Sequence, residues 1–504
     1  MQRILAEIVR VEELCPQKVC DFTFIAYLLT VKVKGAACKG YVLPAGTKGK
    51  IHSTVRMYPS MSTPKKGEEI ILSPTEVHAL FSPLRIDPPI LAHTGKDVRL
   101  RLVFHNPRER EFRFAITSDG LAPTISGTVI RGQELIIPLP EDARSGLYSF
   151  IATCGRWNAK AVLPLVKPGR TYSYELDVNG DGLVERVMEN EFLRLSLSHH
   201  FGARTQSVWL RHSHVDMLGR TFEYEGDEYV EYGGCSEHIG EFPGDLWKAK
   251  FTQHTMSDSS IVFSSTRKSL ELERRVRLLP FLPVVDTTVR IKWKGRGEKD
   301  ILYWHRMAMA TETPSWTSTT CMYTPEKLET VRHTPPTTWR LEQKEYYSPA
   351  CGAAVYLHEQ GRRAFCFMTD RASLEFIGCT SAKGYHLLTP HFRRTRLGSG
   401  RRVGFRYVYV LGDDFILSPD CCIVLCTTPW MDGSRGIALV AKTEKTVERL
   451  HARLSTGESM TLLPKTLKGV GTLLHAYKEI RSREKIVVDL RLGTQVYSLC
   501  AKEA

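Results

Sequence analysis

Short runs of alternating hydrophobic and polar residues fill most of the chain. The clearest run is 98–104, in which hydrophobic residues stand at every second position with Arg99 and Arg101 between them. Successive side chains of a β-strand point to opposite faces, so this period of two predicts a strand with one buried face. The long central part contains no convincing amphipathic helix. The pattern therefore predicts an all-β protein.

Prolines and glycines divide these runs into four segments. We expect a small β-barrel over 1–78, of the type that binds oligonucleotides or oligosaccharides. The segment 86–168, with its turn at Asn106-Pro107, resembles an immunoglobulin-like sandwich. Residues 172–428 are expected to form one large sandwich, and 434–504 a second immunoglobulin-like sandwich. A chain of 504 residues is too long for one ordinary core, which agrees with several domains.

The composition indicates the cellular compartment and the state of the cysteines, but it does not identify a function. No apolar stretch is long enough to span a bilayer, and an acidic residue, Glu7, precedes any long apolar run. The thirteen cysteines form neither zinc-type pairs nor an even disulfide framework. We therefore expect a cytoplasmic protein with buried, reduced thiols and no membrane partner. The net charge of +14 favours anionic partners but does not choose among them, and the oligomeric state cannot be inferred.

The start of the central segment carries a family resemblance. The strand-like run 189–197 begins with Glu189-Asn190 and is followed by Gly202-Ala203-Arg204 and then by a second strand-like run. This order resembles the opening of the galactose-mutarotase-like supersandwich, a fold of aldose epimerases, polysaccharide lyases and glycosidase domains. The pair of runs 270–278 and 284–289 is similar to the long central hairpin of that family. The resemblance implies a carbohydrate-handling β-sandwich.

The epimerases of this family use a histidine as acid and a late glutamate as base. The resemblance implies that His305, in the strand-like run 303–307, takes the place of the histidine. The late stretch 385–394 contains no clear counterpart of the glutamate and offers His391 and Arg393 instead. This departure disfavours mutarotase activity and points to a different sugar chemistry or to binding alone.

The densest polar cluster of the sequence is 232–247, which its glycines and a proline predict to be a loop. Carboxylates accept hydrogen bonds from sugar hydroxyls, an indole ring stacks on a pyranose, and a Glu/His pair can move protons. We predict as catalytic residues Glu237, His238 and His305. We predict as substrate-binding residues Glu241, Asp245, Trp247, His391 and Arg393. The alternative is an ordered loop that Trp247 anchors in the core.

Two further motifs suggest ligands. Asp177, Asn179, Asp181 and Glu185 have the spacing of a short calcium loop, because oxygen ligands stand at alternate positions before a glycine and a later carboxylate follows. A tight turn is the alternative for this stretch. The arginines of 393–402 predict either a solvated hairpin or a clamp for a carboxylated or phosphorylated sugar.

The leading hypothesis is a protein that binds or acts on carbohydrate at the concave face of the central sandwich. As an enzyme it would be a glycoside hydrolase, a lyase or an epimerase-like protein, and two proton-transferring groups across one pocket would favour that case. A non-catalytic structural or assembly protein is the second hypothesis. The third, nucleic-acid binding through Phe22, Tyr27 or Tyr41 of the N-terminal barrel, is not favoured by the sequence.

Overall fold

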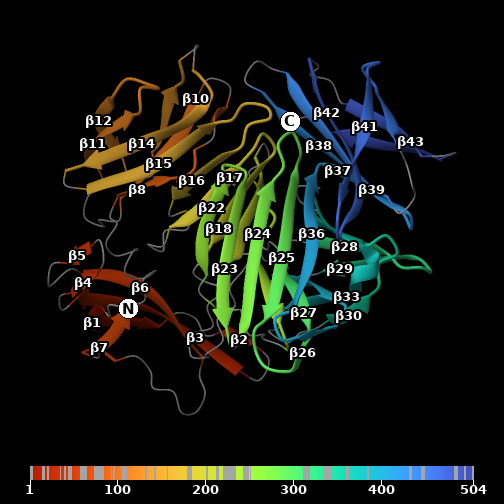
Figure 1. Cartoon of the computed structure of the whole chain (residues 1–504). Coiled ribbons are helices and arrows are strands. Elements are labelled where there is room, and N and C mark those ends of the chain that lie inside the picture. Colours follow the sequence, from red (N-terminus) through yellow and green to blue (C-terminus); the bar gives the residue numbers. More distant parts are fainter. Residues whose placement is uncertain are drawn as a thin grey trace. The chain divides into compact units, whose positions relative to one another are not determined.

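Nearly every element of the computed structural model is a β-strand (Figure 1). The structure describes residues 4–501 apart from gaps between elements, of which the longest are 57–64, 73–83, 105–110, 219–233, 242–248, 310–317 and 334–342. Within the described residues the one helical element is a 3₁₀ turn, η1 (Arg371–Ser373), and no helix there is long and apolar enough to cross a membrane. The predicted all-β, multidomain class is confirmed.

The chain divides into two compact units. The first consists of 1–165, 175–185 and 223–231, and the second of 166–174, 186–222 and 232–504. The predicted division into four domains is finer than this, and it stays a prediction together with its barrel and immunoglobulin-like assignments.

The first unit begins with a five-stranded sheet and a separate pair of short strands. The sheet runs in the order β2-β3-β1-β7, with β6 paired to β3. Its strands are β1 (Ile4–Glu13), β2 (Gln17–Val19), β3 (Phe22–Val33), β6 (Lys48–Arg56) and β7 (Glu69–Leu72). The separate pair is β4 (Ala36–Cys38) and β5 (Tyr41–Leu43). The side chains of Phe22, Tyr27 and Tyr41 lie outside the described part, so the nucleic-acid hypothesis stays untested.

Two four-stranded sheets follow and enclose one hydrophobic core. The first contains β8 (Leu84–Asp87), β9 (His93–Thr94), β10 (Asp97–Phe104) and β13 (Glu134–Pro138). The second contains β11 (Glu111–Ser118), β12 (Ile125–Ile130), β14 (Gly146–Cys154) and β15 (Trp157–Leu165). Val98, Leu100 and Leu102 are buried in this core, as their alternation in the sequence predicts.

The large central sandwich is built from two antiparallel sheets around one core. The ten-stranded sheet runs β16-β17-β18-β19-β21-β27-β34-β33-β30, with β20 on β19. Its strands are β16 (Tyr172–Leu176), β17 (Glu185–Glu189), β18 (Leu193–Ser198), β19 (Arg204–Leu210), β20 (Val215–Asp216), β21 (Gly234–Ile239), β27 (Tyr303–Met309), β30 (Gln343–Tyr347), β33 (Leu374–Ala382) and β34 (Tyr385–Phe392).

The nine-stranded sheet runs β22-β23-β24-β25-β36-β32-β31-β28-β29. Its strands are β22 (Thr252–Ser257), β23 (Ser260–Arg267), β24 (Leu270–Leu278), β25 (Val284–Trp293), β28 (Ser318–Tyr323), β29 (Leu328–His333), β31 (Ala353–His358), β32 (Arg363–Thr369) and β36 (Arg402–Gly412). The predicted central hairpin is confirmed, because β24 pairs with β25 along its whole length. A small two-stranded sheet joins β26 (Glu298–Ile301) to β35 (Thr395–Gly398).

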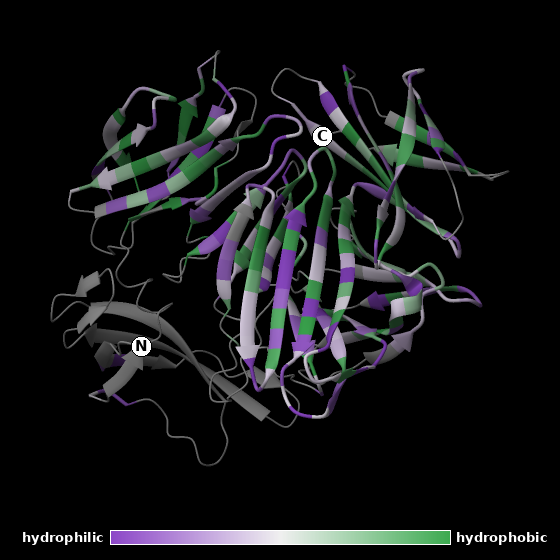
Figure 2. Ribbon diagram, in the orientation of Figure 1, coloured by the Kyte–Doolittle hydropathy of each residue, from purple (hydrophilic) through white to green (hydrophobic). Residues whose placement is uncertain are grey.

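Alternation along β24 explains how this sheet faces the core. Leu270, Leu272, Val276 and Leu278 are buried, and the residues between them are half-exposed. Figure 2 shows the same change between hydrophobic and hydrophilic residues along β24 and β25. Arg274 breaks the rule, because it occupies an inward position and is fully buried. A charge at an inward position requires a partner inside the sandwich.

The last strands of the second unit form a sheet that curls back on itself. They are β37 (Asp414–Leu417), β38 (Cys421–Pro429), β39 (Arg435–Thr443), β40 (Leu450–Leu454), β41 (Ser459–Leu467), β42 (Gly471–Ile480), β43 (Ile486–Leu492) and β44 (Gln495–Ala501). The Asp414 carboxylate accepts a hydrogen bond from the Cys500 amide at 2.8 Å, which brings the first and last strands together. This sheet therefore forms a nearly closed barrel around its own core.

The predicted loop 232–247 is wrong for its first half, which forms β21. Gly234 marks a close approach between strands and not a loop. A Cβ atom there would lie 2.2 Å from the carbonyl oxygen of Thr205 on β19, and the φ angle of Gly234 is +76°. Glycine inside a strand pattern commonly has this meaning. Residues 242–248, which complete the predicted loop, lie outside the described part.

Candidate functional site

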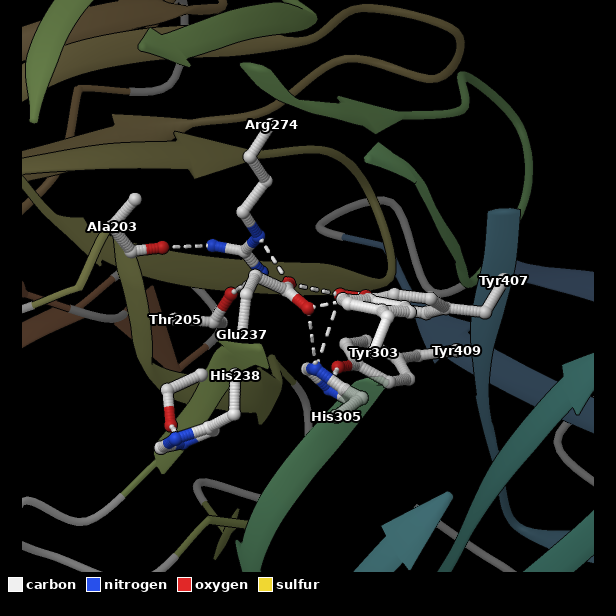
Figure 3. Close-up of polar contacts among 10 residues, drawn as sticks. Ala203, Thr205, Glu237, His238, Arg274, Tyr303, His305, Tyr407 and Tyr409 are labelled. Carbon is white, nitrogen blue, oxygen red and sulfur yellow. Dashed lines mark hydrogen bonds and ion pairs between the residues drawn. The ribbon is translucent and has the colours of Figure 1, made fainter. Parts of the chain in front are cut away.

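Strands β21 and β27 carry the predicted catalytic residues on two opposite faces. Their register pairs Glu237 with His305 and His238 with Trp304. Because side chains alternate along a strand, Glu237 and His305 point together into the sandwich, and His238 and Trp304 lie on the other face of the sheet. Figure 3 shows His238 turned away from Glu237. The structure thus joins Glu237 with His305 and separates both from His238.

The Glu237 carboxylate is fully buried and has polar partners on both oxygens. Oε2 accepts a hydrogen bond from the Tyr303 hydroxyl at 2.5 Å and lies 3.0 Å from Nδ1 of His305. Oε1 accepts a hydrogen bond from the Tyr407 hydroxyl at 2.6 Å and lies 2.8 Å from Nε of Arg274. The Arg274 Nε–H is not aligned for a hydrogen bond, so that contact is an ion pair.

The remaining groups of Arg274 and His305 extend these contacts. The two terminal nitrogens of Arg274 donate to the Ala203 carbonyl and to the Thr205 hydroxyl, and the second of these distances is 2.8 Å. Nε2 of His305 contacts the Tyr409 hydroxyl. We call the side chains of Glu237, Arg274, Tyr303, His305, Tyr407 and Tyr409 the Glu237 cluster (Figure 3). It links β19, β21 and β27 of one sheet to β24 and β36 of the other.

The charges of the cluster set its protonation. Burial by itself raises the pKa of Glu237, but the charges of His305 and Arg274 outweigh it and hold that pKa well below its usual range. Burial, and then the Glu237 carboxylate, raise the pKa of Tyr303 and of Tyr407 well above the usual value. Glu237 is therefore a permanent anion surrounded by neutral phenols, by the Arg274 guanidinium and by the His305 ring. Such a carboxylate does not release or take up a proton near neutral pH.

The other face of the ten-stranded sheet carries a row of aromatic rings. His238 stacks on Trp304 with ring centroids 4.1 Å apart, and Trp304 stacks on His391 at 5.5 Å. His391 in turn stacks on Phe376 at 4.4 Å. The row crosses β21, β27, β34 and β33, and Tyr346 of β30 extends it. We call these five residues the aromatic row.

Tyr346 ends the row in a different orientation. Its ring meets Phe376 edge to face, at an interplanar angle of 81° and a centroid distance of 5.0 Å. Tyr346 pairs across strands with Gly378, and a Cβ atom built there would lie 3.6 Å from two carbons of its ring. The tyrosine ring thus covers the glycine backbone. It is 52% exposed, whereas His238 and Trp304 are buried.

An open depression of about 230 Å³ is lined by Glu375, Arg393 and Arg394, and β33, which carries Glu375, pairs with the strand of Tyr346. Glu375 directly precedes Phe376, and its carbonyl accepts a hydrogen bond from Ser348 at 2.8 Å. Ser348 follows Tyr346 by two residues. The predicted residue His391 therefore lies within the aromatic row, and the predicted residue Arg393 lines the depression.

The remaining predicted binding and calcium residues are not part of the Glu237 cluster or of the aromatic row. Glu241 is exposed just after β21, and Asp245 and Trp247 lie outside the described part. Asp177, Asn179 and Asp181 of the predicted calcium loop lie outside it too. Glu185 is buried, and one of its oxygens accepts a hydrogen bond from the Val178 amide. Among the described residues, no group of three or more histidine, cysteine or acidic side chains is placed to hold a metal.

Sequence reasoning missed several residues that a stricter use of alternation would have found. Arg274 is a charged residue at an inward position of a strongly alternating strand. Trp304 precedes His305 on the same strand, so it belongs to the opposite face. The sequence did not indicate a binding role for Tyr346. That role depends on the pairing of Tyr346 with Gly378, and the register between distant strands cannot be inferred from one sequence.

Solved structures similar to this chain include galactose mutarotase-like proteins and an aldose 1-epimerase. A galactose mutarotase-like protein from Lactobacillus casei is 9% identical, covers 45% of this chain and 99% of its own, and has a TM-score of 0.35. A putative aldose 1-epimerase from Escherichia coli is 11% identical, covers 48% and 99%, and has a TM-score of 0.32. A 4-alpha-glucanotransferase from Thermococcus litoralis is 9% identical, covers 48% and 39%, and has a TM-score of 0.32. The sequence matches no protein-family model and no curated protein. Likeness at this level does not identify an activity.

Replacing the central carboxylate tests whether the cluster stabilises the fold. Glu237→Gln keeps the side-chain shape but leaves buried Arg274 and His305 without their anion. We expect the free energy of unfolding to fall by about 3–5 kcal/mol, measured by urea denaturation at pH 7. The control is Glu273→Gln on β24. Glu273 forms an exposed ion pair with Arg290, so this substitution should change the free energy of unfolding by less than about 0.5 kcal/mol. Equal effects of the two substitutions would contradict the account.

The lowered pKa of Glu237 also predicts a pH dependence. Its folded-state pKa lies below the value of about 4.3 found in unfolded chains. Its charge therefore stabilises the fold fully above that value, and this stability is lost as the pH falls toward the folded-state pKa. We expect the difference in unfolding free energy between the natural protein and Glu237→Gln to shrink as the pH falls from about 5 to about 2. Urea midpoints over this range measure it, and a constant difference would refute the assignment.

Proposed function

We propose that this protein binds carbohydrate at the exposed end of the aromatic row, with the ring of Tyr346 as the stacking platform. The single observation that carries the proposal is the position of this ring over Gly378, with half of its surface exposed. A sugar presents an apolar face that can pack on an aromatic ring, whose large apolar surface then contributes to binding.

The order of the rings supports the choice of Tyr346 within the row. Trp304 stacks between His238 and His391, so both faces of its indole are occupied. The indole N–H is also used, because it donates to the Gly240 carbonyl at 2.9 Å. Tyr346 is turned out of this stack, and about half of its surface is exposed to solvent. It is therefore the ring of the row best placed to receive a ligand.

Polar groups next to the platform suit sugar hydroxyls. Glu375 supplies acceptors, and Arg393 and Arg394 supply donors, around an open depression. A few convergent polar groups beside an aromatic surface are typical of sites for small polar ligands. The combination favours recognition of a sugar over recognition of a purely apolar molecule.

We propose binding and not catalysis as the function of this face. Glu237 and His305 are close enough for proton transfer, but both are fully buried and point away from the platform. A ligand at Tyr346 therefore has no direct contact with that pair. Conversion of a bound glycan by the protein would instead favour the hydrolase, lyase or epimerase-like alternative.

Substitution of the platform tests the proposal. The protein is screened on a glycan array, and the glycan that binds best is titrated by calorimetry. We expect Tyr346→Ala to weaken its affinity at least about tenfold, because the stacking surface is lost, and Tyr346→Trp to retain it.

The matched control is Ile136→Ala, which removes a side chain of equal exposure, 52%, in the first unit and should leave the affinity unchanged. Equal affinities of Tyr346→Ala and the natural protein would refute the proposed site. Failure of the natural protein to bind any glycan would refute the function.

A further inference from the structure

We infer that the bound carbohydrate carries an anionic group, and that Arg393 and Arg394 bind this group. The inference rests on the proposed function, because it concerns the ligand of the same site. It follows from the charges around the depression and from their pairing, and not from the aromatic ring. The ligand class is an acidic sugar, in which a carboxylate, a sulfate ester or a phosphate ester supplies the charge.

The charges that line the depression do not cancel. Its lining contains two cationic residues, Arg393 and Arg394, and one anionic residue, Glu375. Glu375 lies near the start of β33, and Arg393 and Arg394 directly follow β34, which pairs with β33, so neighbouring backbones bring the three residues together. The amide of Arg393 donates to the Ser373 carbonyl at 2.9 Å and fixes the point where the arginine leaves the sheet. The depression is thus lined by exposed side chains of which two are cationic and one is anionic.

The nearby Arg396, Asp300 and Glu298 bring the sum of these charges to zero, but the charges are unevenly paired. Asp300 lies 3.9 Å from Arg394, which is a loose contact, and the same carboxylate is held more closely by Arg396 at 3.1 Å. Arg396 also forms an ion pair with Glu298 at 3.5 Å. Within the part of the chain that the structure describes, Arg393 has no carboxylate within 4 Å. Among the described residues, the Arg393 guanidinium therefore has no ion-pair partner, and that of Arg394 is only weakly paired.

Arginine is suited to this task. Its planar guanidinium presents parallel N–H donors that match the two oxygens of a carboxylate and the oxygens of sulfate or phosphate. Glu375 beside it would repel an anion at the wrong position and accept a hydrogen bond from a ligand hydroxyl. A sugar whose ring lies on Tyr346 and whose acidic group reaches Arg393 satisfies all three features together. A neutral sugar would leave the charge of Arg393 without a partner.

The experiment compares a sugar acid with its neutral ester on the full-length protein. The probes are trigalacturonic acid and its methyl ester, titrated by calorimetry at low salt. We expect the acid to bind at least about tenfold more tightly than the ester, and this ratio to fall toward one in Arg393→Gln and at high salt, where exposed charges are screened. Galactose 6-sulfate and galactose 6-phosphate, each compared with galactose, distinguish the source of the charge.

The control is Arg290→Gln, which removes an exposed arginine of the nine-stranded sheet and should preserve the ratio. Equal melting temperatures of the variants exclude unfolding as the cause of a change. If acid and ester bind equally and Tyr346→Ala weakens both, the anionic ligand is refuted while the carbohydrate site stands. If neither the sugars nor their acids bind, both proposals fall. Binding of a thymidine oligonucleotide as tight as that of the acid would overturn the inference in favour of a nucleic acid.

Discussion

One buried negative charge, on Glu237, determines how the two large sheets of the central sandwich meet. Moving a carboxylate out of water costs several kcal/mol, and the interior recovers this only when its partners are complete and well placed. Here the partners come from strands of both sheets: Arg274 and Tyr407 from one, and Tyr303 and His305 from the other. A shift of either sheet would leave a buried charge unpaired. The cluster therefore favours one spacing and one register.

The two faces of β21 and β27 have different roles, because one face carries the buried Glu237 cluster and the other carries part of the aromatic row. The positions that carry Glu237 and His305 are committed to the interior, and their neighbours His238 and Trp304 are displayed on the opposite face. Because the Glu237 cluster fixes the register of β21 against β27, it also fixes the stacking of His238 on Trp304. The aromatic row then continues through His391 to Tyr346. The interior cluster acts on the candidate site through the backbone, without touching its ligand.

Local pattern was enough to predict most of the fold from the sequence. Strict alternation, as in 98–104 and 270–278, identified strands and their buried faces, and glycines and prolines separated them. The prediction of a loop over 232–247 was wrong in its first half because Gly234 was interpreted as a loop residue. In the structure this glycine allows a close approach to Thr205. The candidate site was only partly predictable. His391 and Arg393 were predicted from the family resemblance, but the importance of Tyr346 depends on its pairing with Gly378, and that contact is a property of the folded sheet.

The most direct test of the account is a crystal structure of the protein with an oligosaccharide bound. We expect a sugar ring packed on the exposed surface of Tyr346, with a polar group of the ligand within hydrogen-bond distance of Arg393. We also expect that Glu237 keeps its contacts with Arg274 and His305 and remains shielded from the ligand. A sugar bound within hydrogen-bond distance of Glu237 or His305 would contradict the account, because the interior cluster would then be the active centre.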